Sequence, residues 1–100
     1  MNAEWYVYLL TCSDDTYYCG IAKDINKRLK AHNLGKGARY TRGRRPTVLV
    51  WRLAEPLSLS QALRLERRLK SMSRSQKMSF VQNVSIQNDF LSEVSSNDAS

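Results

Sequence analysis

The stretch WYVYLLTCSDDTYYCGIAKDINKRLKAHN, residues 5–33, decides the fold. Residues 5–12 are β-branched, aromatic and aliphatic, which is the composition of a strand. Turn-forming residues follow at 13–16, and residues 17–22 resume the strand composition, so a β-hairpin is expected. Gly20 stands inside the second strand, where glycine weakens the strand and often marks a bulge or a close backbone approach. A glycine that only avoids a clash is the alternative.

A helix is expected directly after the hairpin. The Asp24 carboxylate can cap its first turn, and residues 33–35 carry an asparagine and a glycine that can stop it. Arg28 and His32 are four residues apart and lie on the border of the apolar stripe of this helix. That position suits side chains that enter a cleft between helix and sheet. An arginine that snorkels at the edge of the core is the alternative.

Residues 34–46, LGKGARYTRGRRP, are predicted to form a loop with three glycines and five basic residues around one tyrosine. Basic, glycine-rich segments contact phosphates through backbone and side chains together, and an interleaved aromatic ring can stack on an unpaired base. A merely solvated loop is the alternative. The predicted nucleic-acid-binding residues, in this loop and just before the helix, are Lys23, Lys36, Arg39, Tyr40, Arg42, Arg44 and Arg45.

The rest of the chain predicts one more strand and two helices. Residues 47–54 are apolar on both faces, which favours a central or well-covered strand. Ser58 or Ser60 can cap a helix over about 59–72, and a further helix is expected over about 74–84. We find no internal repeat.

Glu66 falls inside the apolar stripe of the helix at 59–72. A carboxylate on an inward face is costly unless it is paired or coordinated to a metal. A simple ion pair with Lys70 or Arg28 remains an alternative to a metal ligand.

Composition and charge bound the possible functions. The 100 residues make one domain, expected at 1–84, followed at 85–100 by an acidic tail that is expected to be disordered. The net charge is +7, all sixteen lysines and arginines precede residue 78, and residues 23–45 hold nine bases against one acid. This field attracts polyanions, of which nucleic acid is the commonest, although a solvated basic face remains possible.

Other classes are disfavoured. No apolar run approaches the roughly 20 residues needed to cross a bilayer, and the N-terminus does not resemble a signal peptide, so a cytoplasmic protein without membrane contact is expected. Cys12 and Cys19 match no zinc pattern and are interpreted as buried, reduced thiols.

Taken in order, these motifs resemble the GIY-YIG nuclease domain, and in particular its small stand-alone bacterial group. The family includes the incision domain of a bacterial excision-repair nuclease, homing endonucleases and resolvases. The resemblance implies an α+β fold, a three-stranded antiparallel sheet flanked by helices in the order β-β-α-β-α-α, which agrees with the order derived above. It covers about residues 4–80. The matching residues are Tyr6-Val7-Tyr8, Tyr18-Cys19-Gly20, Arg28, His32 and Glu66.

The resemblance also implies a reaction, the hydrolysis of phosphodiester bonds with one divalent ion, Mg²⁺ or Mn²⁺. Glu66 would hold the ion, and Tyr8 or Tyr18 would orient or deprotonate the attacking water. Arg28 would grip the scissile phosphate, because its fork of donors fits phosphate oxygens. The remaining carried-over positions are His32, on the helix, and Gly20, which gives the backbone room at the site.

The chain departs from the family pattern in several places. Tyr6 and Val7 replace the glycine and isoleucine of the first triplet, and Cys19 replaces the isoleucine of the second. Ile21 stands where the family often has a polar or basic residue. An asparagine found in larger members has no clear counterpart, although Gln76 is near.

The two tyrosines set a geometric condition. A two-residue turn would place Tyr8 and Tyr18 on opposite faces of the hairpin, because side chains alternate along a strand. A shared site therefore predicts a three-residue loop, a five-residue loop or a bulge near Gly20.

Three hypotheses remain at this point. The first is a Mg²⁺-dependent DNA endonuclease or nickase, in a repair or recombination role. The second is a nucleic-acid-binding module that does not catalyse, and the third is a fold kept for protein contacts. With no second domain, substrate preference would come from shape or from a protein partner, and a monomer is the default.

Overall fold

The computed structural model describes residues 3–99, with side chains described for residues 3–94, and its centre is an antiparallel sheet in the order β2-β1-β3. The strands are β1 (Tyr6–Thr11), β2 (Tyr17–Ala22) and β3 (Val48–Arg52). The helices are α1 (Ile25–Asn33), α2 (Arg39–Arg42), α3 (Leu59–Lys70), α4 (Arg74–Gln82) and α5 (Val84–Ala99). The predicted α+β class and its three-stranded antiparallel sheet are confirmed.

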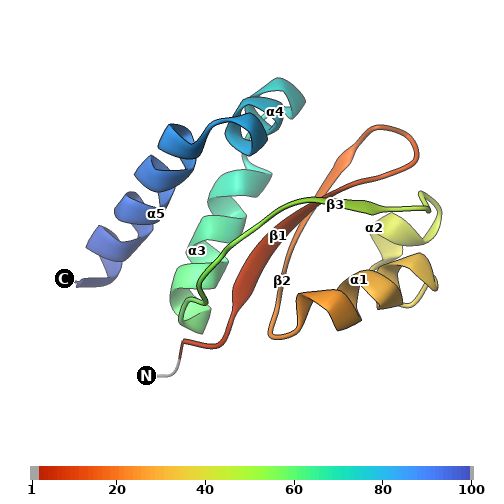
Figure 1. Cartoon of the computed structure of the whole chain (residues 1–100), viewed down its shortest axis with the longest axis horizontal. Coiled ribbons are helices and arrows are strands. Elements are labelled where there is room, and N and C mark those ends of the chain that lie inside the picture. Colours follow the sequence, from red (N-terminus) through yellow and green to blue (C-terminus); the bar gives the residue numbers. More distant parts are fainter. Residues whose placement is uncertain (1–2, 100) are drawn as a thin grey trace.

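The sheet separates two groups of helices (Figure 1). One face of β1 carries Tyr8 and Leu10, which pack with Ala22 and with Ile25 of α1. The other face carries a larger core that α3, α4 and α5 cover; its buried members are Val7, Leu9, Cys19, Leu53, Ala62, Leu65, Leu69, Phe80 and Val94. Since β2 is an edge strand, residues from either layer can reach its open side.

The predicted helix starts are confirmed by their caps. The Asp24 side chain accepts a hydrogen bond from the Lys27 amide, and Ser58 forms a capping box with Gln61. Gln76, considered as a counterpart of the family's asparagine, instead completes a capping box with Ser73 at the start of α4. Its side-chain oxygen accepts from the Ser73 amide at 2.8 Å, so the structure commits it to the helix cap.

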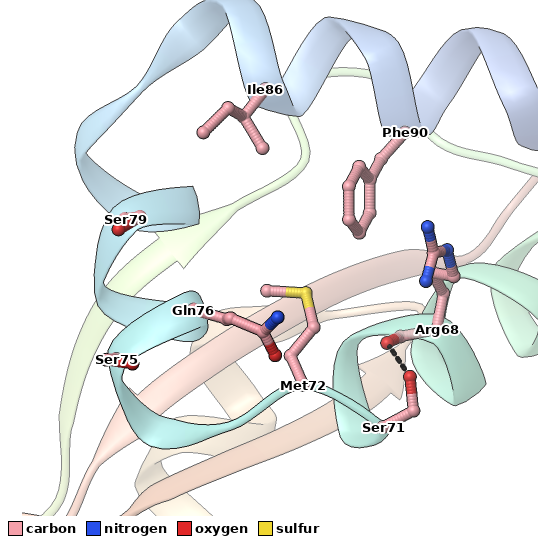
Figure 2. Close-up of a pocket in the computed structure, with 8 residues that line it drawn as sticks. All are labelled: Arg68, Ser71, Met72, Ser75, Gln76, Ser79, Ile86 and Phe90. Atoms are coloured by element: carbon pink, nitrogen blue, oxygen red, sulfur yellow. Dashed lines mark hydrogen bonds between the residues drawn. The ribbon is translucent and has the colours of Figure 1, made fainter.

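The prediction of a disordered tail over 85–100 is wrong for the residues that the structure describes. A helix, α5, runs over Val84–Ala99, and Val94 is only 4% exposed. Figure 2 shows Ile86 and Phe90 of α5 facing Met72 and Arg68 across a hollow between α3, α4 and α5. Apolar residues four apart in a polar background give this helix one buried face, a pattern that the serine-rich, acidic composition obscured.

Two further expectations need correction. The strand at 47–54 is not central, because β1 pairs with both neighbours and β3 lies at the sheet edge with Val48 57% exposed. The segment 34–46 is not all loop, since it contains the short helix α2. A helix of four residues is too short to show a periodic pattern.

Phe80→Ala is expected to lower the free energy of unfolding by about 3–5 kcal/mol, because truncating a buried phenylalanine leaves a cavity. Phe80 is fully buried, and its ring lies 4.8 Å from that of Trp51 and 5.3 Å from that of Phe90, centroid to centroid. Urea unfolding followed by circular dichroism measures the change. Met78→Ala, on the same helix but 39% exposed, serves as the control, and equal losses in the two variants would contradict this account of the core.

Candidate active site

The hairpin places both tyrosines on one face of the sheet. Tyr8 pairs with Gly20 and Leu10 pairs with Tyr18, so residues 8 and 18 share a side. The Cys12 amide donates to the Thr16 carbonyl at 2.8 Å, which leaves a three-residue loop at 13–15. Within that loop Asp15 has φ 64°, the left-handed residue that a three-residue hairpin requires. Of the three arrangements predicted for a shared site (a three-residue loop, a five-residue loop or a bulge near Gly20), the structure has the first.

Gly20 lies opposite Tyr8 because nothing larger fits there. A Cβ at residue 20 would stand 2.5 Å from the Tyr8 hydroxyl oxygen and 3.1 Å from the Tyr18 ring. Gly20 therefore allows a close approach, and it does so by avoiding a clash with Tyr8, so the alternative of a glycine that only avoids a clash remains open.

A chain of hydrogen bonds leads from Tyr8 into the loop after α1. The Tyr8 hydroxyl lies 2.9 Å from His32 Nε2, and His32 Nδ1 lies 2.7 Å from Thr41 Oγ1. Thr41 Oγ1 in turn donates to the Ala38 carbonyl at 3.1 Å. The Thr41 hydroxyl hydrogen is used in the bond to that carbonyl. The hydroxyl oxygen therefore accepts a hydrogen bond from His32 Nδ1–H. Neutral His32 then presents a bare Nε2 that accepts from Tyr8.

Arg28 stands at the outer end of this chain. Burial raises the pKa of Tyr8 to about 12, while Arg28, within hydrogen-bonding reach of the same hydroxyl, acts to lower it. Burial also lowers the pKa of His32, and the charge of Arg28 lowers it further. Tyr8 and His32 are almost completely buried, whereas Arg28 is exposed. The buried chain therefore lies beside a charged, solvent-facing donor.

His32 is expected to titrate below the ordinary histidine pKa of about 6.5. Because the unfolded chain binds the proton more readily, this histidine stabilises the fold above that value, and the contribution is lost as pH falls through the lowered pKa. His32 is the only histidine in the sequence, so one set of imidazole NMR signals reports it. Thr41→Val, which removes the acceptor for Nδ1–H, is expected to shift that titration. A pKa at or above 6.5 in the wild type would contradict the buried neutral imidazole.

Tyr18 is the tyrosine that meets groups from both layers. Burial raises its pKa, the charges of Lys70 and Arg28 lower it, and that of Glu66 raises it. Arg28 comes from α1, and Glu66 and Lys70 come from α3 on the other side of the sheet. Tyr18 is half-buried, and its ring lies 6.5 Å from that of Tyr8, 5.1 Å from that of His32 and 5.9 Å from that of Tyr40. The site is thus built around the open edge of β2.

Glu66 faces inward as predicted, but it is not alone. Its side chain is 18% exposed, and one carboxylate oxygen lies 3.3 Å from the ammonium of Lys70, which is 55% exposed. The alternative of an i,i+4 ion pair is therefore present in the structure. Among the described residues no cluster of three or more His, Cys, Asp or Glu side chains could hold a metal.

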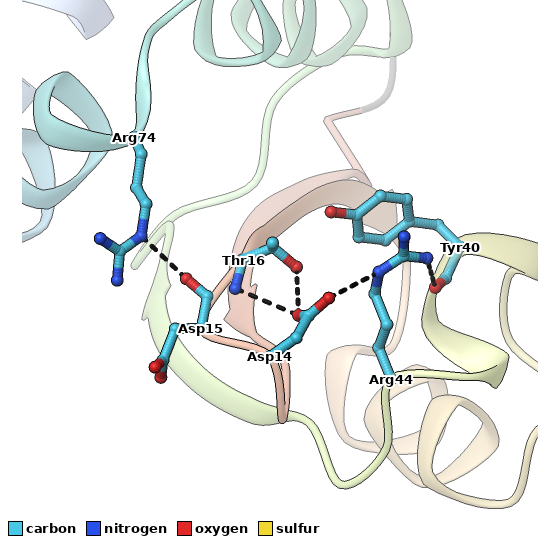
Figure 3. Close-up of polar contacts among 6 residues, drawn as sticks. All are labelled: Asp14, Asp15, Thr16, Tyr40, Arg44 and Arg74. Atoms are coloured by element: carbon cyan, nitrogen blue, oxygen red, sulfur yellow. Dashed lines mark hydrogen bonds and ion pairs between the residues drawn. The ribbon is translucent and has the colours of Figure 1, made fainter.

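Two arginines anchor the hairpin loop at 13–15 to neighbouring segments (Figure 3). Arg44 donates to the Asp14 carboxylate at 2.9 Å and to the Tyr40 carbonyl at 2.8 Å, and its guanidinium covers the Tyr40 ring at 4.0 Å. Arg74 of α4 donates to the Asp15 carbonyl at 2.9 Å. Arg44, predicted to bind nucleic acid, is thus engaged by the protein. Tyr40 likewise packs on Tyr18, and its stacking on a base stays a prediction.

The other predicted nucleic-acid contacts are open to solvent. Lys23 lies over the Trp5 ring at 5.2 Å and 3.6 Å from the Glu4 carboxylate. Arg45 donates from Nε to the Arg42 carbonyl, which leaves the rest of its guanidinium for a ligand. The exposed predicted bases are Lys23, Lys36, Arg39, Arg42 and Arg45.

A comparison with family models matches residues 4–79 to the GIY-YIG catalytic domain. The chain belongs to this family. The match ends at residue 79, before α5 begins. The GIY-YIG superfamily consists in general of nucleases, which sets the coarse function class.

Relatives in other organisms share the same region. A UPF0213 protein of Vibrio cholerae serotype O1 is 42% identical over 81 residues, 81% of this chain and 80% of the relative. A UPF0213 protein of Halobacterium salinarum is 49% identical over 73 residues, 72% of this chain and 92% of the relative.

Two solved structures resemble this one. The solution NMR structure of a UPF0213 protein from Bacillus halodurans gives a TM-score of 0.51 at 42% identity, covering 78% of this chain and 82% of that one. The solution NMR structure of protein EF2693 from E. faecalis gives a TM-score of 0.55 at 30% identity, covering 82% of this chain and 85% of that one. None of the described helices is long and apolar enough to span a membrane.

Sequence reasoning missed two residues of this GIY-YIG site. Thr41 lies in a segment predicted as loop, nine residues after His32, and no local spacing relates the two. Lys70 was visible as the i+4 neighbour of Glu66, but only as a pairing partner and not as a charge acting on Tyr18.

Proposed function

We propose that this protein is a metal-dependent endonuclease or nickase that hydrolyses phosphodiester bonds in DNA. The observation that carries the proposal is the position of Tyr18 at the open edge of β2, where the charges of Arg28 from one layer and of Glu66 from the other act on its hydroxyl. Phosphodiester hydrolysis needs charge neutralised on the phosphate and a positioned water, and this arrangement supplies residues for both tasks.

Glu66 is the residue that would hold the divalent ion. Its carboxylate pairs with Lys70, a solvent-exposed lysine on a flexible stem, and an exposed pair of this kind is weak and can open. When bound, Mg²⁺ or Mn²⁺ would neutralise charge that develops on the phosphate oxygens. One inward carboxylate suffices for an ion that keeps its own waters.

The tyrosines take different roles in this proposal. Tyr18, half-buried at the open edge of β2, would orient the attacking water or, in the fraction that is deprotonated, accept its proton. Tyr8 is 1% exposed and bonded to His32, so its hydroxyl does not face the water. Tyr8, His32 and Thr41 are instead positioning residues that hold Arg28 on the scissile phosphate.

The exposed bases after α1 would contact the flanking phosphates. Such contacts are independent of sequence and strongly dependent on salt. Branched or nicked strands occur in repair and recombination, and we propose that setting for the enzyme.

The test is cleavage of labelled branched, nicked and single-stranded DNA by the purified protein. We expect cleavage with Mg²⁺ or Mn²⁺, none with excess EDTA, and recovery when the ion is restored. Salt-sensitive binding without cleavage under all ions would overturn the proposal and support a non-catalytic nucleic-acid-binding module. Absence of binding at low salt would instead leave a fold kept for protein contacts.

A further inference from the structure

A pocket of about 430 Å³ opens beside Arg28, where the end of β2 meets the start of α1. Part of its wall is apolar, formed by Trp5, Ile21 and Ala22. Its basic side chains are Lys23, Lys27 and Arg28, and the first two, like Arg28, are exposed to solvent. The pocket therefore joins a flat aromatic wall to a concentration of positive charge.

The acidic groups near this pocket are already engaged. Asp24 also lines it, but its carboxylate caps α1 by accepting from the Lys27 amide at 3.1 Å. Glu4 pairs with Lys23 at 3.6 Å, with both side chains more than half exposed, and such a pair is weak enough for a phosphate to displace. The net field in the pocket favours an anion.

The chemistry of the walls identifies the anion as one attached to a planar, largely apolar group. Nucleobases stack on aromatic side chains whatever their sequence, and arginine and lysine hold the adjoining phosphates. A volume of about 430 Å³ lies within the usual range for small-molecule pockets, roughly 300–1,000 Å³, and accommodates a nucleotide. A base stacked inside a duplex can enter only after it has been flipped out, which costs free energy.

Arg28 connects this pocket to the active site. The same guanidinium lines the pocket and acts on the hydroxyls of Tyr8 and Tyr18. If Arg28 grips the scissile phosphate, the nucleotide in the pocket is a direct neighbour of that phosphate along the strand.

We propose that the pocket beside Arg28 binds an unpaired nucleotide next to the scissile phosphate. Its base would stack on Trp5 in place of the Lys23 ammonium, which lies 5.2 Å from the ring centroid, and its phosphate would lie on Lys23 and Lys27. The preferred substrate then carries a single-stranded segment at the cleavage position. This inference rests on the proposed function for its reference to cleavage, while binding can be measured without it.

Tryptophan fluorescence tests the stacking directly. Oligothymidylate is titrated into the wild type and into Trp5→Phe in the presence of EDTA, which prevents cleavage. Quenching is expected in the wild type and largely absent in Trp5→Phe, where the partly buried Trp51 remains as an internal reference. Trp5→Ala, which removes the aromatic ring, is expected to weaken oligothymidylate binding by about tenfold and binding of a blunt duplex far less. Equal quenching in the wild type and in Trp5→Phe would overturn the proposal.

Two lysines of α1 supply a matched pair of variants. Lys27 lines the pocket, whereas Lys30 is equally exposed on the same helix and does not. Lys27→Gln is expected to weaken oligothymidylate binding several-fold more than Lys30→Gln, at one fixed salt concentration. Equal effects would show a general charge effect and contradict a built site.

A third binding experiment, with thymidine monophosphate, distinguishes a nucleotide within a strand from a free nucleotide. The proposal expects it to bind much more weakly than the oligonucleotide, and equal affinity would overturn the assignment to a strand. These results are independent of catalysis. Cleavage without Trp5 quenching rejects the pocket alone, and quenching without cleavage rejects the nuclease alone.

Discussion

Glu66→Gln is expected to abolish metal-dependent cleavage, with the rate falling by at least about a hundredfold. Glutamine keeps the size of the side chain and removes the charge that would hold the ion. Since the Glu66–Lys70 pair is largely solvent-exposed on the lysine side, the loss in unfolding free energy should stay below about 1 kcal/mol. Cleavage assays over a Mg²⁺ titration, with urea unfolding of the same samples, measure both effects.

Glu93→Gln is the matched control for this variant. Glu93 also pairs with a basic residue of α3, Arg68, at 3.4 Å, but both side chains are about half exposed. Its cleavage rate should equal that of the wild type. A direct readout is Mn²⁺ broadening of amide NMR signals around Glu66 in the wild type and its absence in Glu66→Gln. Full activity in Glu66→Gln would reduce the carboxylate to a structural ion pair and remove the metal from the proposal.

Much of this site could be predicted because it depends on local rules. The requirement that Tyr8 and Tyr18 share a face restricts the hairpin loop, and the observed loop at 13–15 satisfies it. The inward position of Glu66 follows from helical periodicity alone. Gly20 marks the close approach because only a missing Cβ leaves room for the Tyr8 hydroxyl.

The remaining parts depend on contacts between distant segments, which no local pattern encodes. Thr41 meets His32 only because the loop after α1 folds back over its own helix. β1 pairs with a strand on each side and so takes the central position of the sheet, which leaves β3 at the edge. For α5, the composition predicted disorder, while four-residue spacing of a few apolar side chains was enough to dock the helix on α3 and α4.

The structure also divides the work between two residues that the sequence could not tell apart. Tyr8 and Tyr18 are both tyrosines, both lie in strands and both project from the same face of the sheet. The family resemblance allowed either of them to act on the water. Burial separates them, since Tyr8 is 1% exposed and bonded to a neutral histidine while Tyr18 remains half-buried. A group that exchanges a proton with water must reach water.

Tyr18→Phe is accordingly expected to slow cleavage by about 10²–10⁴-fold with little change in DNA affinity, the range usual for a general acid or base. Tyr17→Phe is the matched control, because Tyr17 is the preceding residue of β2, is equally half-buried and projects to the opposite face. Single-turnover cleavage and equilibrium binding in EDTA separate the two effects. Equal losses in both variants would attribute the defect to strand packing rather than to the hydroxyl.

The pH dependence then distinguishes the two tasks of Tyr18. Burial raises its pKa above the ordinary 10, so only a small fraction is deprotonated between about pH 7 and 9, and that fraction grows tenfold with each pH unit. If Tyr18 removes the proton from water, the logarithm of the single-turnover rate rises with a slope near one over this range, and Tyr18→Phe loses the slope. If Tyr18 only orients the water, the rate falls in Tyr18→Phe without a change in slope. A slope that persists in the variant would assign the proton transfer to another group.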